Sequence, residues 1–426
     1  MAPYEYLILG GGIAGVSAAE SIRARYARGR IGIISDEPHL LYSRVLLPSY
    51  LKRRVERNRL FLRTADDFSE KGIDLWLGQE AVGLDVEARS VLLKSGNRIS
   101  FENLLITTGG TPNVWGEEKD AQWVYRLQTL DDADRLHNDL GHITRPVVIG
   151  SSFIALEFLE ICLSASIQPT LLAKDPHFFA HLIDSQGGEL FEENFKTHDV
   201  AMIFQDTAVR MSVSLASLSS HSEYTDVKND QGLPFIIETQ EKEKIAADAV
   251  MVGIGLNRTK GFLKDAGIQW GEKGILTNEF FETNLKGIFA AGDVAEFYDV
   301  IRESHHVDGN WTSAFLQGRH AGLVMAGDKK LYKNVSAYSI TNLGFQITAL
   351  GDVTSAAEAI VRIDFAKKQY ERFFVHDGVL QGAVLVNHFS DKPHLARLIE
   401  TRTPIAAHTK KLEDMSFDVQ KIEVVK

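Results

Sequence analysis

The chain has 426 residues, of which 44% are hydrophobic and 24% charged, and its formal net charge is −11. These values are typical of a globular protein with two or three domains, and the negative charge argues against nucleic acid as a partner. A single cysteine, Cys162, excludes an internal disulfide, a paired-cysteine redox centre and any multi-cysteine metal or iron–sulfur site. Any electrons that the protein handles must therefore sit on an organic cofactor.

The first predicted unit is a strand, a glycine turn and a helix. Tyr4–Leu9 has the apolar content of a buried parallel strand, glycines follow at G-x-G-x-x-G spacing, and Ile13–Tyr26 is predicted to be a helix. Gly10 permits the tight turn, Gly12 lets the backbone approach a pyrophosphate, and Gly15 lets helix pack on strand. The unit predicts a dinucleotide site at a helix N-terminus. A motif so early leaves no room for a signal peptide, and no apolar run reaches transmembrane length, so the expected location is the cytoplasm.

The second predicted strand, Ile31–Ser35, ends at an acidic residue. The Asp36 carboxylate follows Gly15 by about twenty residues, where it can accept ribose hydroxyls. The segment Glu37–Arg44 is predicted to be a loop. At its end, Arg44 can pair with cofactor phosphates, although a surface arginine is an equally simple interpretation.

The most basic stretch of the chain runs from residue 52 to residue 63 and is predicted to be helical. Its only acid is Glu56. On an acidic protein this stretch can steer an acidic redox partner, or it can be a solvated helix face. Its cations are Lys52, Arg53, Arg54, Arg57, Arg59 and Arg63.

A second strand–turn–helix unit is predicted from Pro146 onward. Gly150 keeps the first motif glycine and Ala155 is an accepted replacement for the third, but Ser152 stands where a side chain crowds a pyrophosphate. After the next strand comes Ala173 and then Lys174, where an NAD site usually presents a carboxylate. The lysine can meet a 2′-phosphate or have no role. A second nucleotide fold is thus predicted, and whether its site works is left open.

Three later segments complete the predicted architecture. Met211–Gly232 is predicted to be an exposed hairpin or loop insertion. In Thr283–Ala295 an apolar strand runs into Gly292-Asp293 and a predicted helix, so that Asp293 offers acceptors to sugar or ribityl hydroxyls. Trp311 can lie beside a flavin or in the core. From about Leu331 onward, alternating strands and a closing helix predict a small α+β domain.

Together these motifs resemble the pyridine nucleotide–disulfide oxidoreductase superfamily. The branch they resemble most contains rubredoxin and ferredoxin reductases, the flavin-binding part of nitrite reductase, and apoptosis-inducing factor. The resemblance implies an α/β fold with two Rossmann-like dinucleotide-binding domains, one inserted in the other, and a small C-terminal α+β domain. It implies an FAD-binding domain of residues 1–112 and 240–325, an NAD(P)-binding domain of 113–239 and a C-terminal domain of 326–426. The motifs that carry it are Gly10 to Gly15, Asp36 to Arg44, Thr108 to Pro112, Phe153 to Glu157 and Ala290 to Val294.

The resemblance also implies which residues contact each cofactor. Val82 contacts adenine through its backbone, Asp293 binds the ribityl chain, and Glu157 and Gly255 match positions near the nicotinamide. The implied FAD residues are Gly10, Gly12, Ile13, Ala14, Gly15, Asp36, Glu37, Arg44, Val82, Thr108, Gly109, Gly292, Asp293 and Trp311. The implied NAD(P) residues are Gly150, Ser152, Ala155, Glu157, Lys174 and Gly255.

Departures from the family pattern narrow the chemistry. The first helix lacks a cysteine pair, and Val45 stands where relatives that reduce coenzyme A disulfide or peroxides carry one cysteine. Cys162 is predicted to be a small buried hydrophobe, so thiol chemistry is excluded. Ser49 replaces a lysine of many ferredoxin-type relatives, which favours the rubredoxin-reductase and nitrite-reductase side.

The resulting hypothesis is an FAD-dependent NAD(P)H oxidoreductase that passes electrons to a small redox protein or a partner subunit. No catalytic side chain and no metal are predicted, because the flavin carries the chemistry. One alternative is an FAD-containing electron-transfer subunit, or a structural or signalling flavoprotein, with a degenerate NAD(P) site. A third possibility is an oxidase that passes electrons to oxygen. The identity of the acceptor and the choice between NADH and NADPH are left open.

Overall fold

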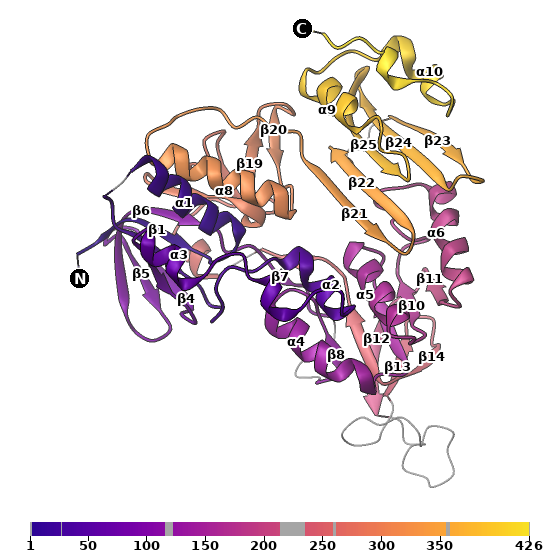
Figure 1. The fold of residues 1–426 in the computed structure, drawn as a ribbon, viewed down its shortest axis with the longest axis horizontal. Helices are drawn as coiled ribbons and strands as arrows, with labels where there is room; N and C mark the ends of the chain where they lie inside the picture. Colours follow the sequence, from indigo (N-terminus) through magenta and orange to yellow (C-terminus); the bar gives the residue numbers. More distant parts are fainter. Residues whose placement is uncertain are drawn as a thin grey trace. The chain divides into compact units, whose positions relative to one another are not determined.

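The computed structural model describes residues 2–26, 28–115, 122–213, 235–258, 261–354 and 358–425 (Figure 1). Most of the predicted insertion Met211–Gly232 lies outside these residues. The chain forms two compact units. Unit 1 contains residues 1–45, 57–111 and 257–338, and unit 2 contains residues 46–56, 112–256 and 339–426. The three-domain division with its boundaries stays a prediction.

Unit 1 is built on a seven-stranded sheet in the order β3-β2-β1-β6-β5-β4, with β18 paired to β6. Strands β3, β2, β1, β6 and β18 are parallel, and β4, β5 and β6 pair antiparallel. The strands β1 and β2 are almost wholly buried, as expected for parallel strands covered on both faces. The bounds are β1 (Tyr4–Leu9), β2 (Ile31–Ile34), β3 (Ile73–Trp76), β4 (Ala81–Asp85), β5 (Ser90–Leu93), β6 (Arg98–Ile106) and β18 (Ile288–Ala290).

The other elements of unit 1 surround this sheet. A smaller sheet has the order β17-β19-β20, with β17 (Ile275–Thr277), β19 (Ala295–Asp299) and β20 (Ser304–His306). The helices are α1 (Ile13–Arg25), α3 (Ala65–Glu70), α7 (Gly261–Asp265) and α8 (Trp311–Met325), with 3-10 turns η2 (Arg57–Leu60) and η5 (Gly292–Val294). At the unit boundaries lie η1 (Arg44–Leu46) and the paired strands β7 (Thr111–Pro112) and β16 (Leu256–Asn257).

Helices α1 and α8 pack unusually closely. A Cβ atom on Gly318 would lie 2.0 Å from the carbonyl oxygen of Ala14, and one on Gly322 would lie 2.5 Å from that of Ala18. Both distances are far shorter than a van der Waals contact between carbon and oxygen, so only glycine fits at these two positions of α8. The first two turns of α1 are therefore fixed relative to the middle of α8.

Unit 2 contains a parallel sheet in the order β11-β10-β9-β15-β8, a three-stranded sheet β12-β13-β14, and a C-terminal sheet β21-β22-β25-β24-β23. The strands of the first two are β8 (Val124–Tyr125), β9 (Pro146–Ile149), β10 (Thr170–Ala173), β11 (Ala201–Phe204), β12 (Ala208–Val213), β13 (Phe235–Thr239), β14 (Lys244–Ala247) and β15 (Ala249–Val252). The C-terminal strands are β21 (Ala337–Asn342), β22 (Phe345–Gly351), β23 (Glu358–Asp364), β24 (Gln369–His376) and β25 (Val379–Val386).

The helices of unit 2 are α2 (Leu47–Leu51), α4 (Leu130–Asp139), α5 (Phe153–Ser164), α6 (Ser185–Thr197), α9 (Lys392–Glu400) and α10 (Thr409–Leu412). Its 3-10 turns are η3 (Leu140–His142), η6 (Ala406–His408) and η7 (Val419–Lys421). The C-terminal sheet packs on α6: the rings of Phe191 and Phe345 lie 4.5 Å apart, and Asn194 donates a hydrogen bond to the carbonyl of Leu343 at 3.1 Å. The nucleotide fold and the C-terminal sheet thus share one core.

Two predicted helices are wrong. The basic stretch from residue 52 to 63 contains turns and the short η2 rather than an α-helix. After Gly292-Asp293 the chain forms the 3-10 turn η5 and then strand β19, in which alternate residues are buried. The helix that was expected there begins only at Trp311.

Candidate cofactor sites

The first glycine turn has the shape that its motif predicts. Gly10 has a φ of +117°, and a Cβ there would lie 2.3 Å from the carbonyl oxygen of Thr107. A Cβ on Gly15 would lie 2.1 Å from the carbonyl oxygen of Gly10. At Gly12, by contrast, a Cβ would meet no atom within 4 Å, and this residue precedes α1 without a side-chain cap. The turn therefore leaves open space at the N-terminus of α1, where an anion is favoured.

A small pocket begins at this turn. Glu37 lines it, whereas the neighbouring Asp36 is exposed and does not. Trp311, in the first turn of α8, also lines the pocket, although it lies far from the other lining residues in the sequence. The lining residues are Gly11, Gly12, Ser35, Glu37, His39, Leu40, Leu41, Tyr42, Arg44 and Trp311.

Arg44 is held in place inside this pocket. Its guanidinium lies 2.6 Å from one carboxylate oxygen of Glu37, and the hydroxyl of Tyr42 donates to the other oxygen at 2.5 Å. The Arg44 side chain is 35% exposed, so it is neither fully buried nor a free surface cation. A cation fixed at the edge of an open glycine turn suits a phosphate group.

The turn between β18 and η5 presents a carboxylate that lacks partners. Gly292 has a φ of +77°. Asp293 is half-buried, and no group among the described residues donates a hydrogen bond to its carboxylate. Burial raises the pKa of Asp293, and the nearby guanidiniums of Arg258 and Arg44 only partly offset this. Such a carboxylate is suited to accept hydrogen bonds from ligand hydroxyls.

Among the described residues of unit 1, the buried polar atoms without a hydrogen-bond partner include Oγ1 of Thr108, just after β6, and Nε of Arg258. Buried polar groups of a folded protein normally form hydrogen bonds, so these atoms are consistent with a polar ligand. Gly109 has a φ of +62° and no neighbour within 4 Å of an added Cβ, while Val82 lies in β4 with 39% of its surface exposed. The residues present therefore fit a bound dinucleotide in unit 1.

The second glycine turn repeats the first. Gly150 has a φ of +121°, and a Cβ on it would lie 2.3 Å from the carbonyl oxygen of Gly253. Ala155 packs so closely that a Cβ on Gly253 would lie 2.8 Å from its backbone nitrogen. The hydroxyl of Ser152 donates to the carbonyl oxygen of Gly253 at 2.8 Å. At the end of this segment Gly255 has a φ of +90°.

Sequence reasoning missed an acidic residue in this second fold. Strand β10 ends at Ala173, Lys174 is exposed, and the carboxylate of Asp175 accepts a hydrogen bond from the hydroxyl of Ser151 in the glycine turn. Asp175 is thus placed beside the turn that should face a nucleotide. It follows its strand by two residues, as Asp36 follows Ile34 in the first fold, and this shared offset could have identified it.

Lys52 is not part of an exposed basic surface. Its side chain is only 4% exposed and its ammonium group lies 3.3 Å from a carboxylate oxygen of Glu157 on α5 and in contact with Glu160. Arg54 lies 3.5 Å from Glu160 but is more than half exposed. Burial raises the pKa of Glu157, and Lys52 opposes this rise. Lys52 is therefore not available on the surface for the predicted docking, whereas Arg53 and its neighbours are exposed.

Cys162 is a buried hydrophobic residue, as predicted. It is fully buried in α5, and its sulfur lies 3.5 Å from that of Met251. Burial raises the pKa of the thiol to about 12. A thiolate is thus absent near neutral pH, which excludes a role as nucleophile.

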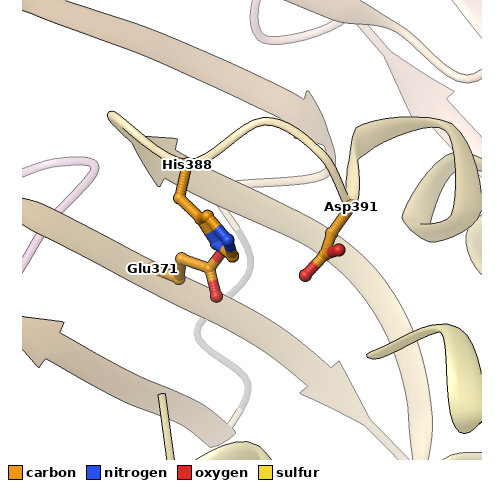
Figure 2. Close-up of side chains that lie close together, drawn as sticks. All are labelled: Glu371, His388 and Asp391. Atoms are coloured by element: carbon orange, nitrogen blue, oxygen red, sulfur yellow. The ribbon is translucent and has the colours of Figure 1, made fainter. Parts of the chain in front are cut away.

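The C-terminal sheet brings together three side chains of metal-binding type. Glu371 on β24, His388 after β25 and Asp391 at the start of α9 each offer a ligand atom, and these atoms lie within 4.8 Å of one another (Figure 2). His388 Nδ1 lies 2.6 Å from an oxygen of Glu371. Figure 2 shows Glu371 on its strand, close to His388, whereas His388 and Asp391 both lie on the loop that leads to α9.

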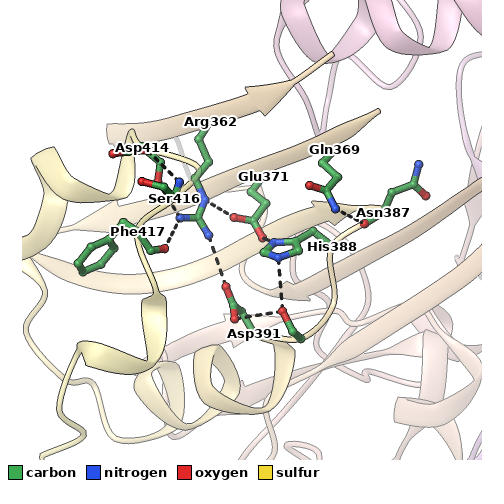
Figure 3. A network of polar contacts seen from close by, with 10 residues as sticks. Arg362, Gln369, Glu371, Asn387, His388, Asp391, Asp414, Ser416 and Phe417 are labelled. Atoms are coloured by element: carbon green, nitrogen blue, oxygen red, sulfur yellow. Dashed lines mark hydrogen bonds and ion pairs between the residues drawn. The ribbon is translucent and has the colours of Figure 1, made fainter. Parts of the chain in front are cut away.

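A guanidinium occupies this cluster, however. The fully buried Arg362 forms ion pairs with Glu371 and, at 3.4 Å, with Asp391 (Figure 3). Its other nitrogen donates to the carbonyl oxygens of Asp414 at 3.1 Å and Phe417 at 2.9 Å. Because its guanidinium already pairs with both carboxylates, the cluster is an ion-pair network that holds the C-terminal segment.

Comparison with known proteins places the chain in a family. Residues 4–318 match the family model described as pyridine nucleotide-disulphide oxidoreductase. The chain belongs to this family. Residues 338–403 also match the model for the rubredoxin NAD+ reductase C-terminal domain. Among the described residues, no helix combines the length and apolar character needed to cross a membrane.

Two curated relatives and one solved structure illustrate how similar the chain is to known proteins. The chain is 24% identical over 408 residues to the NADH-dependent phenylglyoxylate dehydrogenase subunit epsilon of Aromatoleum evansii, covering 94% of this chain and 92% of the relative. It is 32% identical over 343 residues to the peroxisomal monodehydroascorbate reductase 2 of Oryza sativa subsp. japonica, covering 75% and 68% of the two chains. The solved covalent putidaredoxin reductase–putidaredoxin complex matches in fold, with a TM-score of 0.88, 22% identity and coverage of 99% and 98%.

Family membership confirms the predicted class of protein. Members bind FAD and NAD(P)H, so the chain is an FAD-dependent NAD(P)H oxidoreductase with two Rossmann-like folds and a small C-terminal domain. The residues assigned to each nucleotide remain proposals that the geometry above supports.

Proposed function

We propose that the protein takes hydride from NADH and passes electrons, through FAD, to a small redox protein. The single observation that carries the proposal is the repetition of one arrangement in both nucleotide folds. In each fold a glycine at positive φ opens the turn, and an acid follows the next strand by two residues: Gly10 with Asp36, and Gly150 with Asp175.

In the proposed first site, the open turn at Gly12 and the cation of Arg44 hold the pyrophosphate, and Asp293 accepts hydrogen bonds from hydroxyls of the ribityl chain. Thr108 and Arg258 offer their unpartnered polar atoms to the same ligand. The flavin, when bound, accepts hydride and releases electrons one at a time. The chain's own residues bind and orient the cofactor, and none is needed as a general acid or base.

We propose NADH rather than NADPH for the second site. Asp175 is held at the glycine turn by Ser151, where a carboxylate can accept the ribose hydroxyls of NADH and repels the 2′-phosphate of NADPH. Lys174 is exposed, and we assign it no part in the choice between NADH and NADPH. The Ser152 hydroxyl is engaged with the backbone of Gly253, which favours a turn that is still able to receive a pyrophosphate.

The acceptor is proposed from the C-terminal match and from the relatives. The rubredoxin NAD+ reductase model covers residues 338–403, and a structural neighbour is a reductase joined to putidaredoxin. A partner subunit is the second candidate, because one relative is itself a subunit of a larger enzyme. Docking is proposed to use the exposed residues Arg53, Arg57 and Arg59 rather than Lys52. The three predicted domains and a cytoplasmic location complete the proposal.

An anaerobic stopped-flow titration of the purified yellow protein tests the proposal. NADH is expected to bleach the visible flavin band rapidly, whereas NADPH does so at least tenfold more slowly. Asp175→Ser should weaken this preference, and Lys174→Ser is the matched control that leaves it unchanged. Bleaching by dithionite but by neither nucleotide would contradict the proposal and favour an electron-transfer subunit. NADH-dependent oxygen consumption that no carrier protein alters would favour an oxidase.

A further inference from the structure

A line of buried polar side chains runs behind the turn that carries Asp293. The backbone N–H of Gly292 donates to Oε1 of Gln317 at 2.9 Å, and Nε2 of Gln317 donates to a carboxylate oxygen of Asp308 at 3.2 Å. Gln317 lies within α8 and is 2% exposed, and the Asp308 side chain is 4% exposed. The turn is therefore connected to Asp308 by two consecutive hydrogen bonds in the interior of unit 1.

Only one orientation of the Gln317 amide satisfies both neighbours. A backbone N–H can only donate, so Oε1 must face Gly292, and the NH₂ group must then face the acceptor Asp308. The negative charge of Asp308 thus determines the orientation of the Gln317 amide, and the amide oxygen in turn holds the N–H of Gly292 in place. Gly292 needs this support because its N–H is buried and an unpaired donor there would be costly.

Asp308 has defined surroundings. His306 lies 3.6 Å from its second oxygen, Arg302 and Asp299 act on it electrostatically, and Ser313 and Ser336 contribute hydrogen bonding. Burial raises the pKa of Asp308, and Arg302 opposes the rise. Asp308 is therefore an acceptor within a charged network, rather than an isolated buried acid.

We propose that Asp308 and Gln317 are positioning residues that hold the Gly292-Asp293 turn in the geometry that binds FAD. The inference rests on the proposed role of Asp293 in cofactor binding. It extends that role to two side chains that no glycine motif contains, and it makes FAD affinity depend on the polarity of the Asp308–Gln317 pair.

Reversing that polarity tests the proposal. Gln317→Glu keeps an acceptor for Gly292 but places two carboxylates face to face. The double variant Asp308→Asn/Gln317→Glu restores the pair, because the new asparagine donates to the new glutamate. Asp308→Asn alone keeps an acceptor oxygen for Gln317. Gln381→Glu, at a half-buried position in β25, is the matched control for the amide-to-acid change.

The first readout is the dissociation constant of FAD, measured by titrating each apoprotein while following flavin fluorescence. At pH 8, Gln317→Glu is expected to weaken FAD binding at least tenfold, and the double variant should return it to within about threefold of the parent chain. At pH 5.5 the loss in Gln317→Glu should shrink, because one proton shared by the facing carboxylates removes their repulsion. Gln381→Glu should change the constant less than threefold.

The second readout is the midpoint potential of bound FAD. In the double variant the negative charge moves from residue 308 to residue 317, one hydrogen bond closer to Gly292. Its potential should therefore fall below that of the parent chain, although its FAD affinity is restored. A purely structural role for the pair would leave the potential unchanged.

Three outcomes would overturn the proposal: unchanged FAD affinity in Gln317→Glu, no rescue by Asp308→Asn, or a double variant that does not fold. If Gln317→Glu alone fails to fold while the double variant folds and binds FAD, the pairing is supported. Failure of the proposed function is seen separately, because the parent apoprotein would then bind no FAD, or Asp293→Asn would bind it as tightly as the parent.

Discussion

The ammonium group of Lys52 lies 3.3 Å from a carboxylate oxygen of Glu157, with both side chains largely removed from solvent. The contact joins the segment after α2 to the middle of α5. Glu160, one turn further along α5, contacts the same ammonium group. A residue that looks like part of a basic surface is thus the counterion of two buried acids.

Replacing Lys52 should destabilise the protein strongly. Lys52→Met keeps most of the side-chain volume but leaves Glu157 without its cation and Glu160 with only the exposed Arg54, and breaking such a buried pair typically costs about 3–5 kcal/mol. Urea denaturation followed by circular dichroism measures the loss. Arg59→Gln removes one exposed cation and is the control, expected to change stability by less than about 0.5 kcal/mol. Equal stability of the two variants would show that the buried pair is not needed.

Asp293→Asn should separate stability from cofactor binding. Because burial raises the folded-state pKa of Asp293, the folded apoprotein binds a proton more tightly than the unfolded chain. Apoprotein stability is therefore lost as pH rises from the ordinary value of an aspartate through the raised folded value. The asparagine variant lacks this loss, so its melting temperature should exceed that of the parent apoprotein at pH 8 and approach it near pH 4.

The same variant should bind FAD at least tenfold more weakly, because hydrogen bonds to a charged acceptor contribute about 1.5–3 kcal/mol. Flavin fluorescence during titration of the apoprotein measures this. A variant that is less stable at pH 8, or that binds FAD normally, would contradict the assignment of Asp293.

Cys162 should be chemically inert in the folded protein. With a thiol pKa of about 12, less than one thiol in a thousand is ionised at pH 8, and burial also blocks access. A chromogenic disulfide reagent should therefore react only after guanidinium chloride is added. Cys162→Ala should keep the rate of flavin reduction within twofold, and a larger loss would reopen thiol chemistry.

Arg362 should be essential to the C-terminal domain. Arg362→Met leaves Glu371 and Asp391 buried without a cation and frees the carbonyls of Asp414 and Phe417, so we expect a loss of about 3–5 kcal/mol. Hydrogen exchange followed by mass spectrometry should show the segment that contains residues 414–417 losing protection first. Arg402→Met, at an exposed arginine of the same unit, is the control. Unaltered protection in Arg362→Met would exclude the proposed role of the network.

Charge reversal should test docking without touching the buried pair. Arg53→Glu combined with Arg59→Glu removes exposed cations, and should slow reduction of an acidic carrier protein about tenfold at low salt. Anaerobic flavin reduction by NADH should stay unchanged. As ionic strength rises, the rates at which the parent chain and the double variant reduce the carrier should become equal, because salt screens the charges. If the rates already agree at low salt, the carrier docks elsewhere.

Much of the nucleotide folds was predictable, because their determinants are local. Gly10, Gly12 and Gly15 lie within six consecutive positions, and the strand and helix around them form as predicted. The helix placed after Asp293 was wrong, although burial alternates from Ala295 to Asp299 as in a strand. A period of two could have been recognised there.

What sequence reasoning could not supply are contacts between distant positions. Lys52 and its two acids are 105 and 108 positions apart, so nothing near the basic stretch indicates that one cation is buried. Gln317 and Gly292 are separated by 25 positions. Asp175 is the exception, since only its offset from β10 had to be counted.

The two glycines of α8 that meet the backbone of α1 determine more than local packing. One helix begins at the turn proposed for the pyrophosphate and the other begins at Trp311, which lines the same pocket. The separation between the turn at Gly12 and Trp311 thus depends on Gly318 and Gly322, neither of which lines the pocket. A change in the width of this pocket therefore requires a change at these glycines as well as at the residues that line it.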